Sequence, residues 1–142
     1  MENKMIIDSL RDYFLLCELL KDGKLNIDFL GDGEEYSIDP LPADPIVKKY
    51  VDGGTVRQLE FAFTSKSRFD DDARTGIENS GFCQKLIEWV ENNNKNGVLP
   101  VLEDPKHVPV TIEIMASGYL FDMDPNYARY QIQCRLVYEQ EV

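Results

Sequence analysis

The alternation of apolar and polar residues predicts two main helices. Apolar residues recur at steps of three and four over residues 5–22, and Gly23 follows as a natural helix stop, so we expect the first helix there. Its broad apolar face suits packing on a sheet or against a neighbouring subunit. The second helix is expected over residues 73–93, and its buried side consists of Ile77, Phe82, Leu86, Trp89 and Val90.

Alternation with a period of two predicts strands in the remaining segments. The candidates are residues 25–29, 36–38, 46–51, 55–64, 108–114 and 127–139. Asp52, Gly53 and Gly54 form the turn of a hairpin between the third and fourth candidates. Residues 118–121 either extend the fifth strand or form a bulge, and residues 122–126 form the turn that follows.

This order of elements predicts the fold class. Helices separated by runs of hairpin-connected strands are typical of an α+β protein. We therefore expect a mostly antiparallel sheet of about four to six strands, flanked by two main helices that lie on one face. Residues 1–142 are expected to form a single domain, because we find no repeat, linker or low-complexity segment.

The last predicted strand has two chemically different faces. Its apolar face consists of Ala128, Tyr130, Ile132, Cys134, Leu136 and Tyr138. Its polar face consists of Arg129, Gln131, Gln133 and Arg135. A polar sheet face is usually only solvated, but long polar side chains on one strand can also contact another protein. Both interpretations stay open, and these four residues are candidate protein contacts.

Arg57 is the fifth candidate protein contact. It shares one face of its strand with Leu59, Phe61 and Phe63, and it marks the point where that face reaches solvent.

The composition is that of an ordinary globular protein that needs no disulfide bonds for its stability. The 142 residues are 43% hydrophobic, which is enough to bury a core. Cys17, Cys83 and Cys134 are widely spaced and form no Cys-x-x-Cys pair, so we expect buried free thiols in a reducing compartment. We see no signal peptide and no apolar run of transmembrane length, so the expected location is the cytoplasm.

The net charge of −11 argues against direct binding of the protein to nucleic acid. Acidic residues number 26 and basic residues 15, whereas binding to phosphate backbones depends on Lys and Arg. An acidic surface favours solubility. It would also repel DNA that passes nearby.

The sequence is poor in catalytic chemistry. His107 is the only histidine, and no P-loop, GxGxxG, GxSxG or HExxH motif is present. Asp70, Asp71 and Asp72 could bind a cation, but acidic residues just before a helix also cap its amides and complement its dipole, which we favour. We assign no catalytic residue, cofactor or metal ligand, and expect no enzyme. A small-molecule or metal-binding protein with an acidic pocket stays open as the alternative from another class.

Three stretches within residues 56–139 resemble a known family. They are residues 57–63 (RQLEFAF), residues 77–82 (IENSGF) followed by Trp89, and residues 117–122 (SGYLFD) followed by residues 128–138 (ARYQIQCRLVY). In this order they resemble minor capsid or tail-terminator-like proteins of phages and prophages of Gram-positive bacteria. Residues 1–55 match that family only in their pattern of elements.

The resemblance implies a virion structural protein without enzymatic residues. Such a protein forms a hexameric ring at the head-proximal end of the tail tube, where it stops polymerisation and meets the head-side connector. DNA passes through the ring without specific binding. We expect acidic loops such as residues 32–35 or residues 68–72 to line or approach the pore. A head-tail joining or stopper protein, one ring nearer the capsid, is the alternative within the same class.

Overall fold

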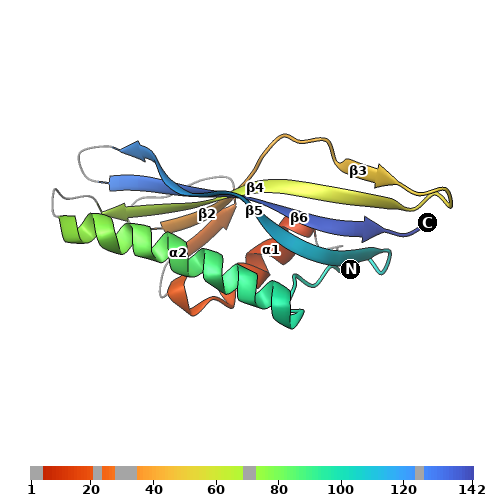
Figure 1. The fold of residues 1–142 in the computed structure, drawn as a ribbon, viewed down its shortest axis with the longest axis horizontal. Coiled ribbons are helices and arrows are strands. Elements are labelled where there is room, and N and C mark those ends of the chain that lie inside the picture. The colour runs from red at the N-terminus through yellow and green to blue at the C-terminus, as the bar shows by residue number, and fades with distance from the viewer. Residues whose placement is uncertain (1–4, 21–23, 28–34, 69–72, 124–126) are drawn as a thin grey trace.

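The computed structural model describes residues 5–20, 24–27, 35–68, 73–123 and 127–142 (Figure 1). Within these ranges the α-helices are α1 (Ile6–Leu15) and α2 (Ala73–Asn96), and a 3-10 turn covers Glu18–Leu20. The strands are β1 (Lys24–Ile27), β2 (Glu35–Pro40), β3 (Ile46–Lys49), β4 (Thr55–Arg68), β5 (His107–Met123) and β6 (Tyr127–Gln140). The predicted α+β class is confirmed.

The strands form a six-stranded sheet in the order β1-β2-β4-β6-β5, and β3 pairs with one end of β4. All neighbouring strands are antiparallel except β1 and β2, which are parallel. The centre of the sheet is the pairing of β4 with β6, which runs without interruption from Thr55 opposite Gln140 to Arg68 opposite Tyr127. The mostly antiparallel sheet predicted from the sequence is therefore confirmed.

Both α-helices lie on the same side of the sheet, and an aromatic cluster joins them to it (Figure 1). The Phe14 ring of α1 lies 5.9 Å from the Phe61 ring and 5.1 Å from the Phe63 ring of β4. Trp89 of α2 lies 6.0 Å from Phe14 and 4.9 Å from Tyr13, measured between ring centroids. Such pairs contribute roughly 0.5–1.5 kcal/mol each beyond the burial of their apolar area. The core thus lies between the helices and one face of β4 and β6.

The first helix is shorter than predicted. It ends at Leu15 rather than at residue 22, and the chain tightens through bonds from the Leu16 and Cys17 amides to carbonyls three residues earlier. Leu16 is 69% exposed, whereas Cys17 and Leu20 are buried. Cys17 and Leu20 thus still reach the core, as their helical spacing from Leu10 and Phe14 predicts, although the α-helix itself ends before them. Gly23 lies outside the described residues.

The second helix is longer than predicted and runs to Asn96 instead of residue 93. Asparagine is a weak helix former, but here Asn93 and Asn94 gain tertiary hydrogen bonds to Tyr13 and Ile112. The helix ends where Gly97 adopts φ +72°, and the Val98 amide donates to the Asn93 carbonyl at 2.8 Å. This is the six-to-one bond of a Schellman ending, which needs a left-handed residue such as glycine.

Strands β4 and β5 also extend beyond their predicted ends. Polar residues 65–68 stay in β4 because they pair with β6, and residues 65–66 also pair with β2 on the other side. Strand β5 runs through residues 118–121 to Met123, with register shifts against β6. Of the turn predicted at residues 122–126, residues 122 and 123 belong to β5, and residues 124–126 lie outside the described part.

Candidate functional site: the open face of the sheet

Four of the five candidate contact residues share the sheet face that is turned away from both described helices. In β6, Ile132, Cys134 and Leu136 are buried beneath the helices. Since successive side chains of a strand point to opposite faces, the residues between them point away from the helices. Arg129, Gln131, Gln133 and Arg135 therefore form a row along this side, which we call the open face.

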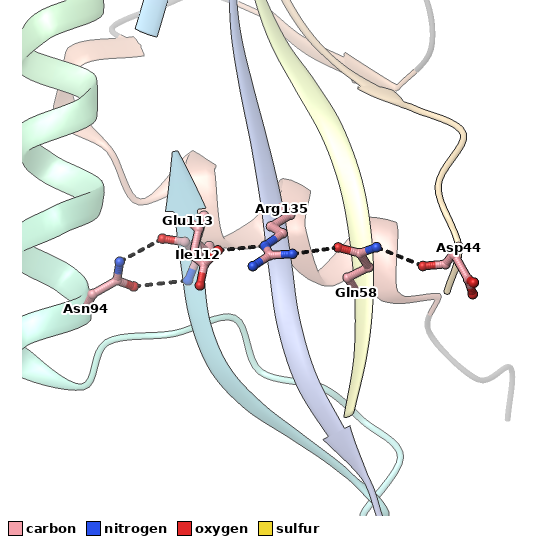
Figure 2. Close-up of polar contacts among 6 residues, drawn as sticks. All are labelled: Asp44, Gln58, Asn94, Ile112, Glu113 and Arg135. Carbon is pink, nitrogen blue, oxygen red and sulfur yellow. Dashed lines mark hydrogen bonds and ion pairs between the residues drawn. The ribbon is translucent and has the colours of Figure 1, made fainter. Parts of the chain in front are cut away.

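Arg135 is held by partners on both neighbouring strands (Figure 2). Its Nε lies 2.6 Å from Glu113 Oε2 on β5, and its Nη1 donates to Gln58 Oε1 on β4 at 3.0 Å. Gln58 Nε2 in turn donates to the Asp44 carbonyl at 2.8 Å. The chain of contacts crosses three strands and reaches the β2–β3 connection. It fixes the direction of the guanidinium group.

The Arg135–Glu113 ion pair contributes more to orientation than to stability. The Arg135 side chain is 27% exposed and the Glu113 side chain 43% exposed. Ion pairs open to solvent contribute roughly 0–1 kcal/mol, because water and salt screen them. A pre-ordered arginine, however, loses less conformational entropy when a partner binds to it.

A second polar cluster surrounds Asp39 on the same face. Ser37 Oγ donates to the Asp39 carboxylate at 3.0 Å, and Thr64 Oγ1 donates to it at 2.8 Å. Gln131 Nε2 lies 3.4 Å from Thr64 Oγ1 and links the cluster to β6. Ser37 and Thr64 are buried although they lie on the open face. Hydrogen bonds thus connect polar side chains of β2, β4 and β6 across the open face.

The sequence analysis missed Gln58, Glu113 and Asp39, which hold the candidate residues in place. The available signal was the polar alternation of the strands carrying Gln58 and Glu113. That pattern places them on a polar face but does not show which of them lies opposite Arg135. The register supplies this information. Glu113 of β5 lies directly opposite Arg135. On β4, Glu60 lies opposite Arg135, and Gln58 lies two residues from Glu60 on the same face, within diagonal reach of Arg135.

Arg57 lies on the other face, as its alternation with Leu59 and Phe61 predicted. Its Nε donates to Thr55 Oγ1 at 3.0 Å. Burial raises the pKa of the Tyr138 hydroxyl, and the nearby positive charge of Arg57 offsets part of that rise. The structure therefore does not bring Arg57 together with the other four candidates.

His107 is the first residue of β5 and contacts residues of β6. Its ring is 5.2 Å from the Tyr138 ring in an edge-to-face arrangement, and its Nε2 is 3.2 Å from Gln140 Oε1. This environment packs and orients the imidazole.

The thiols offer little reactivity. Cys17, Cys83 and Cys134 are buried and free, as predicted, whereas the expected reducing compartment stays a prediction. Burial raises the pKa of Cys83 to about 11 and that of Cys134 to about 12, so both stay protonated at neutral pH.

The acidic segments considered for metal or pore roles are only partly described. Residues 32–34 and 69–72 lie outside the described residues, so the prediction that they approach a pore stays a prediction. Within the described ranges, no group of three or more His, Cys, Asp or Glu side chains is placed to hold a metal ion. None of the helices described is long and apolar enough to cross a bilayer.

The site therefore consists of ordered polar side chains on one face of a sheet, suited to contact with another surface. No protein-family model matches the chain, and no curated protein matches it.

Proposed function

We propose that this chain is a virion structural protein of a phage or prophage. In this proposal it forms a ring at the head-proximal end of the tail tube, as a tail terminator or tail-completion protein. It assembles in the bacterial cytoplasm, and its partners are further copies of itself, the tube protein and the head-side connector. The proposal rests on the sequence resemblance and on the open face of the sheet.

The open face is the observation that carries this proposal. Both described helices cover the same side of the sheet (Figure 1). By alternation along β6, the row from Arg129 to Arg135 lies on the other side. Arginine is enriched in protein interfaces, because its planar fork forms several hydrogen bonds at once. A row of ordered polar side chains on a 14-residue strand supports a role in protein contact.

The net charge of −11 supports the same proposal. A ring at the end of a tail surrounds a channel for DNA. An acidic protein does not neutralise phosphates, so it does not hold the DNA by counterion release. The chain then acts through shape and surface contacts with proteins.

Electron microscopy of assembled tails tests the function directly. Tails are assembled from the other virion proteins with and without this chain and examined by negative staining. We expect tubes of variable length when the chain is absent, and uniform joined tails when it is added. Uniform tails that join heads without the chain would refute the proposal. Uniform tails that fail only at joining would indicate the head-tail joining role.

A matched pair of variants connects that assay to the open face. Arg129→Ala/Arg135→Ala removes two positive charges from this face and should fail to restore uniform tails. Lys85→Ala/Lys95→Ala removes two positive charges from exposed positions of α2 and should restore them. Circular dichroism melting of both variants checks that each is folded. Equal restoration by folded variants would contradict the role of the open face.

A further inference from the structure

A groove of about 1000 Å³ lies between the start of α1, the segment that precedes β5, and the strands β4 and β6. Its apolar lining includes Ile6, Ile7, Leu59, Leu102 and Tyr138. The groove opens to solvent, and its volume is at the upper end of the range seen for pockets that hold small ligands. It is large enough to receive several side chains.

The polar groups of the groove favour a cationic occupant. Two of the described residues that line it, Glu103 and Asp104, carry carboxylates, and both are exposed. No lysine or arginine is among these lining residues. Ser9 also lines the groove and is 2% exposed, yet its Oγ has no hydrogen-bond partner among the described residues. A buried hydroxyl without a partner is unfavourable, and an occupant with a polar group could satisfy it.

The tip of the β3–β4 hairpin, residues 47–53, has the complementary character. Val47, Tyr50 and Val51 are exposed apolar residues, and Val51 is fully exposed. Lys48 and Lys49 are exposed beside them, and Asp52 is the only acid in these seven residues, so the tip is positive in a chain of net charge −11.

The tip is also ordered. The Tyr50 amide donates to the Gly54 carbonyl at 2.8 Å, and the Gly54 amide donates to Asp52 Oδ1 at 2.9 Å. Gly53 adopts φ +96°, which favours glycine. The Lys48 ammonium lies 5.3 Å from the centre of the Tyr50 ring. A pre-formed apolar tip of this kind loses little entropy on docking.

We infer that the hairpin tip of one copy docks in the groove of the next copy. Val51 and Tyr50 enter the apolar lining, and Lys48 and Lys49 face Glu103 and Asp104. The hairpin extends past both helices and lies beside the C-terminal end of its own chain (Figure 1). Its exposed Tyr50 and Val51 are therefore accessible to another copy. The inference rests on the proposed function, because it names the contact that joins neighbours in the ring.

The arrangement is head to tail. Each copy contributes one tip and one groove, and these are different surfaces, so the contact is heterologous. Heterologous contacts form a closed ring when the rotation between neighbours divides a full turn, and they form an open filament when it does not. A ring needs a contact of this type.

Cross-linking of engineered cysteines tests the contact. Val51→Cys on one preparation is mixed with Met5→Cys on another, and a short bis-maleimide is added. Met5 is exposed and lines the groove, whereas Leu16, near the opposite end of α1, is equally exposed and lies outside it. We expect at least tenfold more cross-linked dimer with Met5→Cys than with Leu16→Cys. The native cysteines are buried, so they contribute little background.

Charge reversal tests the proposed electrostatic match. Lys48→Glu/Lys49→Glu in the Val51→Cys chain should lower the cross-linking yield at least fivefold. Glu103→Lys/Asp104→Lys in the Met5→Cys chain should restore it. All four positions are exposed, so the melting temperatures should stay close to that of the unmodified chain. Equal yields for Met5→Cys and Leu16→Cys, or a yield that does not respond to charge reversal, would overturn the inference.

This test separates the contact from the function. Selective cross-linking combined with uniform joined tails in the absence of the chain would keep the contact and refute the tail role. Unselective cross-linking combined with defective tails in the absence of the chain would keep the tail role and refute this contact.

Discussion

Asn94 forms a two-bond pair with the backbone of Ile112 (Figure 2). Its Nδ2 donates to the Ile112 carbonyl at 2.8 Å, and the Ile112 amide donates to its Oδ1 at 3.2 Å. Strand β5 is the last strand of the sheet, so the carboxamide takes the place of a neighbouring strand at this residue. One side chain thus fastens α2 to the edge of the sheet.

Replacing Asn94 with Ala should destabilise the fold. The change leaves the Ile112 amide and carbonyl without their partner, and the expected loss in the free energy of unfolding is about 1–3 kcal/mol. Urea unfolding followed by circular dichroism measures the loss. Asn92→Ala is the matched control, because Asn92 is exposed on the same helix, and it should change stability by less than about 0.5 kcal/mol. Equal effects of the two variants would show that the pair contributes nothing.

Phe14→Ala should be among the most destabilising single substitutions. The Phe14 side chain is buried against Phe61, Phe63 and Trp89, and its removal leaves a cavity where both helices meet the sheet. Losses of about 3–5 kcal/mol are typical for such a change. Leu15→Ala, at the exposed neighbour, should cost less than about 1 kcal/mol. Thermal unfolding of both variants checks the contrast.

The Arg135–Glu113 pair should matter little for stability. A double-mutant cycle with Arg135→Ala and Glu113→Ala should give a coupling energy below about 1 kcal/mol, because both side chains are partly exposed. Chemical denaturation of the four proteins gives this value. A coupling well above about 2 kcal/mol would indicate that the pair supports the fold itself, and would weaken its interpretation as a pre-ordered contact group.

The buried thiols should be protected in the folded chain. At pH 8, a thiol reagent such as dithionitrobenzoate should label the native protein slowly and all three cysteines rapidly once urea is added. The physical reason is burial, which excludes the reagent and raises the pKa of Cys83 to about 11 and that of Cys134 to about 12. Rapid labelling of the native protein at either cysteine would contradict this environment.

Stability should also fall in alkali. An unfolded chain loses its thiol protons near the ordinary pKa of 9.0, whereas the folded chain retains them until pH 11 to 12. Between these values the unfolded state binds fewer protons, so the free energy of unfolding decreases as the pH rises. The raised pKa values of Tyr13 and Tyr138 act in the same direction. Urea unfolding at pH 7 and pH 10 measures the decrease, and Cys83→Ala/Cys134→Ala should show a smaller one.

The sequence pattern was sufficient for the order and type of the main elements, although not for all of their ends, and for the two faces of β6. Alternation with a period of two separates Ile132 and Cys134 from Gln133 and Arg135 without knowledge of any partner. The same rule placed Arg57 on the face of Leu59 and Phe61. These features depend only on neighbours along the chain, which is why they could be predicted.

Features that depend on pairing between distant segments could not be predicted. Asp39 meets Thr64 because β2 and β4 pair in one register out of several that the pattern allows. The parallel pairing of β1 and β2 has no local signal, and neither has the turn at residues 16–20. The groove likewise combines the start of α1 with residues 102–105, which are distant in sequence.

The irregular register of β5 has a consequence for behaviour at high concentration. Its pairing with β6 shifts between residues 109 and 111, 114 and 116, 116 and 119, and 120 and 122. A long, flat outer strand would be a template for fibril growth, but bulges twist such a strand and interrupt its row of hydrogen-bonding groups. These shifts therefore disfavour edge-to-edge pairing of β5 with the sheet of another copy at high protein concentration.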